Sequence, residues 1–284
     1  MSVSGQTGGS GALLSVPWIG RLVRAFTDWI TTLVRPPRLM AASRQRTSEL
    51  RRLTLGSILA LVVISATMIW IDAAAMEWQK RLPPLIVQVF EEITHFGRSG
   101  WLLVPIGILM FAVAAIGSPA LGRFSNLVLA TLIVRLGYVF VAIALPGLVI
   151  TVAKRLIGRV RPSDLGPFAY EPLSWRASYA SLPSGHATSV FAALVAIGIV
   201  WPRARPILWC YALLIAASRI VVSAHYPSDV LAGALCGALG ALMVRDWFAV
   251  RRLGFFVGTD GAVHPLPGPS WRRLKRVARH RFGQ

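Results

Sequence analysis

Long apolar runs alternate with short polar segments between residues 53 and 249. The run Leu53–Ile71 carries no charged side chain. At about 1.5 Å of helix rise per residue, it nearly spans a hydrocarbon core of about 30 Å. The runs Trp101–Gly122 and Asn126–Ala153 have the same character. Residues 72–100 mix prolines and charges with apolar residues, which predicts an extramembrane loop containing a short amphipathic helix. We therefore expect three membrane-spanning helices in this part of the chain.

Three further apolar runs follow, one after His186, one before Arg219 and one after Asp229. Each holds about 13 to 16 uncharged residues, which is short for a span by itself. The shortfall is explained if the polar residues at their ends lie just below one membrane surface. A chain that alternates across the bilayer brings all three ends to the same side. The sequence thus predicts an all-α fold, an integral membrane bundle of six transmembrane helices.

The N-terminal part shows a different periodicity. Between Leu13 and Val34, apolar residues recur at helical spacing, while Arg21, Arg24 and Asp28 fall on another face. This pattern favours an amphipathic helix that lies in the membrane interface, or one that packs against the protein itself. We expect three segments, which are a cytoplasmic or interfacial segment (1–52), a membrane domain (53–249) and a basic cytoplasmic tail (250–284).

Composition supports membrane insertion. The chain is 55% hydrophobic and only 14% charged, whereas soluble domains contain about 25% charged residues. Its two cysteines, Cys210 and Cys236, lie inside apolar runs, so we interpret them as packing residues and not as a disulfide or metal site. Arg135 interrupts the third span. An intramembrane arginine is either a functional group or a side chain that snorkels to the nearer interface.

The formal net charge of +19 lies mostly beside the apolar runs and at the two termini. Lys and Arg in these places are better explained by anionic lipid headgroups than by nucleic acid. Most of them fall on the side of the termini, so the positive-inside rule places both termini in the cytoplasm and the polar clusters on the periplasmic face of the cytoplasmic membrane. The basic tail includes Trp271, Arg272, Arg273, Lys275, Arg276 and Arg279.

The first polar cluster contains Lys154 and Arg161, followed by Pro162. Two residues seven apart lie two turns apart on one face of a helix, and proline ends a helix. We expect the two cations to point the same way, whereas Arg155 and Arg159 fall on other faces and meet lipid headgroups. Taken alone, such a pair most often anchors a helix at the interface.

The second cluster is Pro183-Ser184-Gly185-His186, at the start of the fourth apolar helix. Serine is a good N-cap and glycine permits close backbone approach. The free N–H groups and the positive helix end then favour an anion. His186 is placed to donate a proton. The alternative is an ordinary capped helix start with an incidental histidine.

The third cluster begins with Ser218-Arg219 and continues with His225 and Asp229. A guanidinium at a membrane helix end is costly unless an anion pairs with it. A carboxylate that binds one imidazole nitrogen leaves the other nitrogen free to attack, as in a catalytic triad. An isolated His and Asp at this spacing is usually structural.

Together the three clusters resemble the type 2 phosphatidic acid phosphatase superfamily at every motif position. The resemblance is firm over residues 154–229 and extends through the helix pattern to about 53–249. It implies a metal-independent phosphatase without a cofactor, in which His225 forms a phosphohistidine, Asp229 orients it and His186 protonates the leaving oxygen. It further implies that Lys154, Arg161, Ser184, Gly185 and Arg219 hold the phosphate oxygens.

Elementary chemistry agrees with these roles. Phosphoryl transfer needs in-line positioning and stabilisation of charge on the oxygens, which fixed cations and a helix N-terminus provide. His225 must be neutral to attack and His186 protonated to act as an acid, so we expect a bell-shaped pH profile. A zinc site of His186, His225 and Asp229 is disfavoured by the neighbouring cations. A lipid or anion transporter would need the cations but not an oriented nucleophile.

The substrate is less sharply defined. A catalytic pocket among membrane helices favours a lipid phosphate such as phosphatidic acid, phosphatidylglycerophosphate, undecaprenyl diphosphate or lipid A. The resemblance leaves open hydrolysis or transfer of the phosphate to a second lipid. The segment Ser163–Leu182 either covers the headgroup or packs as a lid on the bundle. Its aromatic and charged residues are Phe168, Tyr170, Glu171, Trp175, Arg176 and Tyr179.

Overall fold

The computed structural model describes residues 45–116, 122–162 and 165–282, with six isolated positions between residues 20 and 36. The predicted interfacial helix between Leu13 and Val34 otherwise lies outside the described residues. The helices are α2 (Gln45–Trp70), α3 (Asp72–Gln79), α4 (Pro84–His95), α5 (Ser99–Ile116), α6 (Gly122–Ile157), α7 (Gly185–Val200), α8 (Arg205–Val221), α9 (Pro227–Val250) and α10 (Trp271–Phe282). Short 3₁₀ helices cover Ala177–Tyr179 and Pro202–Ala204, and the strands are β1 (Phe255–Val257) and β2 (Val263–Pro265).

All six predicted apolar runs are helical, as α2, α5, α6, α7, α8 and α9. Four helical stretches among the described residues are long and apolar enough to cross a membrane, and α2 with α3 makes a fifth if the bent pair counts as one span. The apolar helix α7 has only 16 residues. The predicted all-α membrane fold is therefore confirmed, but the count of six spans is not.

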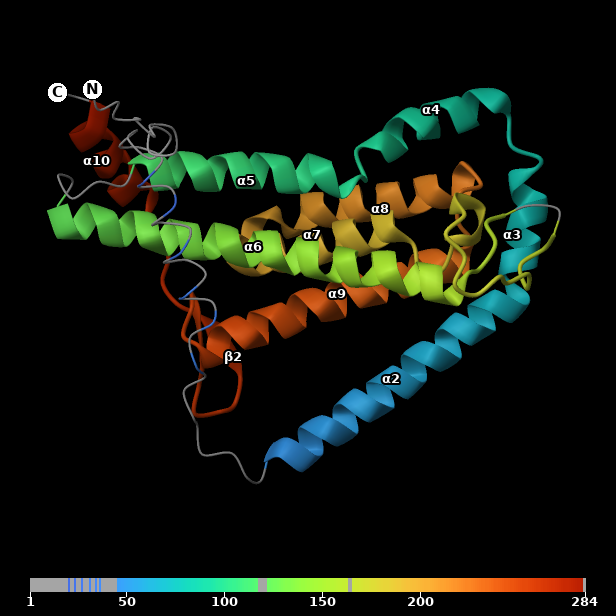
Figure 1. Cartoon of the computed structure of the whole chain (residues 1–284), viewed down its shortest axis with the longest axis horizontal. Helices are drawn as coiled ribbons and strands as arrows, with labels where there is room; N and C mark the ends of the chain where they lie inside the picture. Colours follow the sequence, from blue (N-terminus) through green and yellow to red (C-terminus); the bar gives the residue numbers. More distant parts are fainter. Residues whose placement is uncertain are drawn as a thin grey trace, which may run out of the picture.

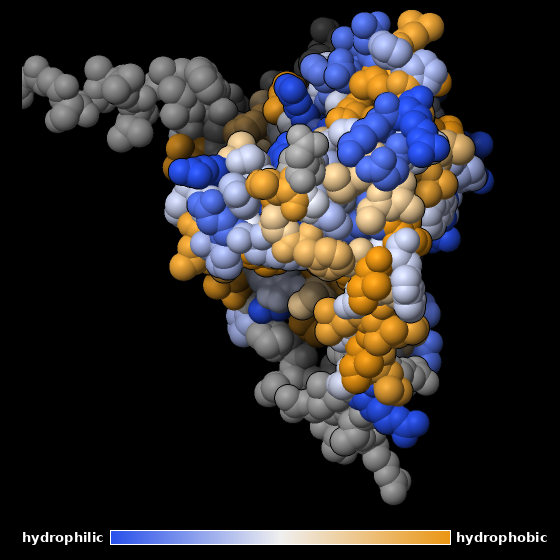
Figure 2. All heavy atoms as spheres, turned by 90° about the vertical axis from the view of Figure 1, so that its right-hand side faces the viewer, coloured by the Kyte–Doolittle hydropathy of each residue, from blue (hydrophilic) through white to orange (hydrophobic). Residues whose placement is uncertain are grey.

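The helices α5 to α9 run side by side along the long axis of the molecule, and α2 diverges from them (Figure 1). Small side chains fill the contact between α6, α7 and α9, where Ala142, Ala192 and Ala241 are fully buried. Tyr138 packs edge-on against Phe255, with ring centroids 4.8 Å apart. Many apolar residues of α2 are exposed, as expected for a helix facing lipid (Figure 2).

Two glycines bring α9 directly against the backbone of α7. A Cβ added at Gly233 would lie 2.4 Å from the carbonyl oxygen of Ser184, and one at Gly237 would lie 2.2 Å from that of Thr188. Any larger side chain would push the helices apart, since packed interiors leave no room for it. The N-terminal ends of α7 and α9 therefore meet at one end of the bundle.

Residues 72–100 differ from the expected loop with one short helix. They form two helices, α3 and α4, before α5 begins at Ser99. The axis of α3 is bent by 47° from that of α2. Asp72 begins α3 and is fully buried, so part of this segment belongs to the interior of the protein.

The tail forms a hairpin and an amphipathic helix, neither of which was expected from the sequence. Strands β1 and β2 pair antiparallel. Leu274 and Val277 of α10 pack on Val113 of α5 and Val128 of α6. Arg135 donates a hydrogen bond from Nη2 to the carbonyl oxygen of Leu266. This arginine therefore binds the tail, away from the polar clusters.

Candidate active site

The structure brings the predicted site residues to one end of the bundle. Lys154 lies in the last turn of α6, and Gly185 and His186 begin α7. Arg219 lies in the last turn of α8 and Asp229 in the first turn of α9. The charged groups are close enough to interact, because Arg219, His225, Arg98 and Arg161 all act electrostatically on His186. These polar side chains meet because α6 and α8 end where α7 and α9 begin.

A cavity of about 410 Å³ opens at this end. Arg98, Lys154, Gly185 and His186 line its polar part. Leu103, Ile143, Ala144 and Leu148 continue the wall between α5 and α6. The cavity thus joins a cationic end to an apolar wall.

Arg161 reaches the site differently from the prediction. Helix α6 ends at Ile157, and Gly158 has a φ of 64°, so Arg161 follows in an irregular segment and is not on the same helix as Lys154. A Cβ at Gly158 would lie 1.8 Å from the carbonyl oxygen of Glu171, which makes glycine necessary there. The backbone N–H of Arg161 donates to the carbonyl of Ser178 at 2.8 Å. The argument from helical spacing was therefore wrong, although Arg161 is still close enough to act on His186.

His225 lies in the turn between α8 and α9 and is only 4% exposed. Its Nδ1 is 3.7 Å from Oδ2 of Asp229, which is too long for a hydrogen bond. Ser181 lies beside this pair and contacts both residues. Its Oγ donates to Asp229 Oδ2 at 2.5 Å and is 3.5 Å from His225 Nδ1. Burial lowers the pKa of His225 below its ordinary value, although Asp229 acts in the opposite direction. The imidazole is therefore neutral at pH 7.

The start of α7 carries the second cluster. Ser184 holds the N-cap position, but its side chain does not cap the helix. Its Oγ is buried and has no hydrogen-bond partner among the described residues. The backbone N–H of Ser184 donates to the carbonyl of Asp229 at 2.9 Å, which ties the second cluster to the third. The space at Gly185 is open, since an added Cβ would meet nothing within 4 Å. This helix start can therefore receive an anion.

Arg219 is held by the preceding part of the chain. Its Nη1 donates to Oγ1 of Thr94 at 2.6 Å, while its Nε is buried without a partner in the described part of the protein. Gly97 lies against the ring of His186, where an added Cβ would be 2.7 Å from Cδ2. The α4–α5 junction thus forms one wall of the site.

Sequence reasoning missed a buried network behind His225. Arg159, expected to meet headgroups, is completely buried and pairs with Asp72 at 2.7 Å and with Asp229 at 2.6 Å. Ser228 and Ser181 complete the network. The interpretation of Arg159 as a surface residue was wrong, because the chain turns at Gly158 and leads the following residue inward. No sequence signal links Asp72 to the third cluster.

Among the described residues, no group of three or more His, Cys, Asp and Glu side chains is arranged to hold a metal ion. Cys210 is exposed, Cys236 is partly buried, and both are free. The charged groups that act on the two histidines include three arginines and Asp229. These groups suit a phosphate oxyanion.

Two solved structures match part of the chain. The crystal structure of LpxE from Aquifex aeolicus matches with a TM-score of 0.44 at 22% identity and covers 61% of this chain and 93% of that one. The crystal structure of a PAP2-type phosphatidylglycerolphosphate phosphatase from Bacillus subtilis matches with a TM-score of 0.45 at 25% identity. It covers 67% of this chain and 92% of that one.

Sequence comparison is more decisive. The PAP2 superfamily model matches residues 135–253. Lipid A 1-phosphatase of Rhizobium etli is 35% identical over 183 residues, covering 63% of this chain and 78% of that protein. The enzyme of the same name from Rhizobium johnstonii is 35% identical over 202 residues, covering 70% and 80%. Decaprenylphosphoryl-5-phosphoribose phosphatase of Mycobacterium tuberculosis is 34% identical over 154 residues, covering 53% and 75%. The chain therefore belongs to the PAP2 superfamily, the type 2 phosphatidic acid phosphatases, and is a membrane phosphatase.

Proposed function

We propose that this protein removes the 1-phosphate of lipid A by way of a phosphohistidine at His225, on the periplasmic face of the cytoplasmic membrane. The observation that carries the proposal is the convergence of two histidines with Lys154, Arg161 and Arg219 at one end of the bundle. Three fixed cations and a helix N-terminus suit the charge of a transferring phosphoryl group.

The chemistry has two steps. Nε2 of neutral His225 attacks phosphorus, an N–P bond forms and the P–O bond to the lipid breaks. His186, which the negative charge of the bound phosphate holds in its protonated form, gives that proton to the leaving oxygen. Water then attacks the phosphohistidine, His186 takes a proton from that water, and free phosphate leaves. Asp229 stabilises the charge that develops on the imidazole. The phosphoryl oxygens bind the three cations, Ser184 Oγ and the backbone N–H of Gly185.

Burial supports the nucleophile assignment. A histidine must be neutral to attack, and burial holds the pKa of His225 below its ordinary value. Its Nδ1 is directed to Ser181 and Asp229, which leaves Nε2 for the substrate. One imidazole nitrogen is thus occupied by an orienting group and the other is available for attack.

The cavity favours an amphipathic substrate. A phosphate held by Lys154 and His186 would leave the attached lipid next to the apolar wall between α5 and α6, which includes Leu103 and Leu148. The loop after Arg161 exposes Phe168 and Trp175, the latter by 83%. Aromatic residues favour the membrane–water interface. We propose that they contact the headgroup region of the lipid.

The proposed substrate rests on the curated relatives. The two lipid A 1-phosphatases match 63% and 70% of this chain, whereas the mycobacterial phosphatase matches 53%. Hydrolysis of another lipid phosphate is the first alternative. Transfer of the phosphate to a second lipid is another, since the phosphohistidine could be attacked by a phosphate or hydroxyl oxygen in place of water.

The test is a phosphate-release assay on purified protein in detergent with excess chelator. Lipid A carrying only the 1-phosphate, lipid A carrying only the 4′-phosphate, phosphatidic acid, phosphatidylglycerophosphate and undecaprenyl diphosphate are compared at equal surface concentration. We expect fastest release from the 1-phosphate and none from the His225→Ala protein. Faster release from another lipid would overturn the assignment of the substrate. Phosphate release by His225→Ala would overturn the assignment of His225 as the nucleophile. Phosphate recovered on a second lipid would identify a phosphotransferase, whereas lipid movement unaffected by His225→Ala would identify a transporter.

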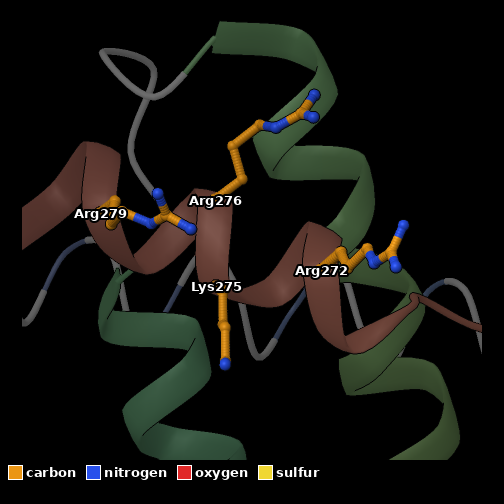
Figure 3. Close-up of a pocket in the computed structure, with 4 residues that line it drawn as sticks. All are labelled: Arg272, Lys275, Arg276 and Arg279. Carbon is orange, nitrogen blue, oxygen red and sulfur yellow. The ribbon is translucent and has the colours of Figure 1, made fainter.

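The basic tail supports the proposed orientation. Arg272, Lys275, Arg276 and Arg279 of α10 line a cavity of about 720 Å³ (Figure 3). Helix α10 lies at the opposite end of the bundle from the site (Figure 1). The 36 residues of α6 that separate the two ends span about 54 Å, more than a bilayer core. We propose that α10 rests on anionic headgroups of the cytoplasmic leaflet. Added phosphatidylglycerol should then raise the Tm of the wild-type protein more than that of a variant with all four cations changed to glutamine.

A further inference from the structure

Arg159 is a buried cation that none of the three motifs contains. Its side chain is 0% exposed, so other parts of the protein enclose it completely. A buried guanidinium is costly unless every charge around it is paired in good geometry. The position of Arg159 therefore requires an explanation that the phosphate-binding roles do not give.

The contacts of Arg159 connect four parts of the chain. Nη1 donates to Asp229 Oδ1 at 2.6 Å and to Ser228 Oγ at 2.7 Å. Nη2 donates to Asp72 Oδ2 at 2.7 Å. Nε and Nη2 both donate to the carbonyl of Pro167, at 3.1 and 3.0 Å. The guanidinium also lies over the ring of Tyr226, 4.3 Å from its centroid. Only the planar fork of arginine can make these contacts together.

Arg159 and its neighbours leave the carboxylate of Asp229 one orientation. Oδ1 accepts from Arg159, while Oδ2 accepts from Ser181 and from the backbone N–H of Tyr226 at 3.0 Å. Rotation of the carboxylate would break all three hydrogen bonds. Oδ2 is also the atom 3.7 Å from His225 Nδ1. The orientation of the imidazole thus depends on the hydrogen bond from Arg159 to Oδ1, the carboxylate oxygen of Asp229 that does not face His225.

Asp72 balances the charge of Arg159 and joins the same helix start. Its Oδ1 accepts from the backbone N–H of Ser228 at 3.0 Å, and its Oδ2 accepts from the hydroxyl of Ser228 at 2.5 Å. A carboxylate at this position satisfies a free N–H group in the first turn of α9 and interacts favourably with the helix dipole. Burial by itself lowers the pKa of Arg159, but Asp229 and Asp72 outweigh burial and raise it.

We propose that Arg159 and Asp72 are a buried positioning pair that fixes the Asp229 carboxylate, so that the catalytic apparatus begins at the α2–α3 junction, outside the matched residues 135–253. This inference rests on the proposed role of His225. Neither residue touches the substrate. The pair orients Asp229, and Asp229 with Ser181 orients the nucleophile.

Four variants separate the parts of this pair. Arg159→Met alone removes the guanidinium charge. Arg159→Lys keeps the charge and loses the fork. Asp72→Asn keeps the shape and loses a charge. Arg159→Met with Asp72→Asn removes both charges together. A misplacement of about 1 Å can cost on the order of 100-fold in rate. We expect each single change to lower kcat for phosphate release by about 10-fold to 100-fold with KM within about twofold, because the substrate contacts are intact.

The pH profile distinguishes positioning from simple structural support. The charges of Asp229, Arg219 and Arg161 act on His225. Loss of the guanidinium in Arg159→Met leaves the negative charge of Asp229 less compensated, which raises the pKa of His225. The acidic limb of kcat should therefore move to higher pH in Arg159→Met and return toward the wild-type position in the double variant. A purely structural role would lower Tm without moving this limb.

A second ion pair, at the C-terminal end of α3, provides the matched control. Lys80 and Glu77 pair at 3.0 Å on the surface, with both side chains more than half exposed. Lys80→Met and Glu77→Gln should leave kcat and the pH profile unchanged. If Arg159→Met does not fold, Asp72→Asn and Arg159→Lys still test the proposal.

The outcomes are distinct. Wild-type kcat in Arg159→Lys and Asp72→Asn would overturn the positioning pair and leave the proposed function intact. If the wild-type protein, like His225→Ala, released no phosphate from any of the lipid phosphates, the proposed function and the positioning pair would both be overturned. Reduced kcat in Arg159→Lys and Asp72→Asn and a moved limb in Arg159→Met, together with unchanged controls, is the result expected here.

Discussion

His225 Nδ1 and Asp229 Oδ2 lie 3.7 Å apart, and the hydroxyl of Ser181 lies beside them in contact with both. The hydroxyl proton is directed to the carboxylate, so the hydroxyl oxygen can accept the N–H of the imidazole. Catalytic hydrogen bonds are often long without substrate and shorten in the bound complex. The two residues thus form an orienting pair, and the serine adds a second contact to each of them.

Ser181→Ala should reduce kcat by about 10-fold, since it removes one of the groups that hold the imidazole and leaves the phosphate contacts unchanged. The measurement is steady-state phosphate release, with KM expected to stay within about twofold. Ser174→Ala is the matched control, because Ser174 lies in the same loop and bonds Glu171 at 3.1 Å, away from His225. Equal activity of the two variants would show that the hydroxyl of Ser181 does not help to orient His225.

Activity should persist below the pH at which an ordinary histidine becomes protonated. The unperturbed imidazole pKa is about 6.5, and burial lowers that of His225. His225 therefore stays neutral, and able to attack, until the pH falls below that value. The acidic limb of kcat/KM should lie below pH 6.5 when measured from pH 4 to 9. An acidic limb above pH 6.5 in the wild-type protein would contradict this expectation.

The same shift predicts the pH dependence of stability. The folded pKa of His225 lies below its unfolded value, so folding stability from this group is fully present above the unfolded pKa. It is lost as pH falls through the folded pKa. Thermal unfolding in detergent should show a lower Tm on acidification in this window. His225→Asn, which cannot be protonated there, should show a smaller decrease.

Gly233→Ala should destabilise the protein by about 1–3 kcal/mol, because its Cβ would press on the carbonyl oxygen of Ser184. Activity should fall as well, since Ser184 and His186 move with the start of α7. Gly56→Ala is the control. Nothing lies within 4 Å of a Cβ at this position of α2, so Tm should stay equal or rise slightly. Thermal unfolding and phosphate release check both variants.

The orientation can be tested with single cysteines in a background of Cys210→Ser and Cys236→Ser. Trp175→Cys reports on the loop beside the site, and Trp271→Cys reports on α10, because both tryptophans are largely exposed. A membrane-impermeant maleimide should label the first in intact spheroplasts and the second only in inverted vesicles. The reverse pattern would place the site in the cytoplasm.

The helices and most of the site residues follow from local patterns. A run of apolar residues must be helical in a bilayer, because hydrocarbon leaves each backbone group no other partner. Lys154, Ser184, His186 and Arg219 were expected near helix ends, and the structure places them there. The family resemblance depends on these short spacings. They require no knowledge of how the helices pack.

Other features depended on contacts between distant residues. The prediction that Lys154 and Arg161 share one face of a helix was wrong. Helix α6 ends before Gly158, whereas the prediction had the helix continue to Pro162. Residues 72–100 form two helices and bring Asp72 into the interior. The tail hairpin and the bond from Arg135 to Leu266 were equally invisible in the sequence.

The sequence by itself determined that this chain enters a membrane and carries the chemical groups of a phosphatase, because hydrophobic length and motif spacing are local properties. Only the tertiary structure decided what holds those groups in place. Arg159 pairs with Asp72, 87 residues away in the chain, and with Asp229, 70 residues away in the other direction. Buried charges select their partners by proximity in space, after the helices have packed, and no pattern along the chain encodes that proximity.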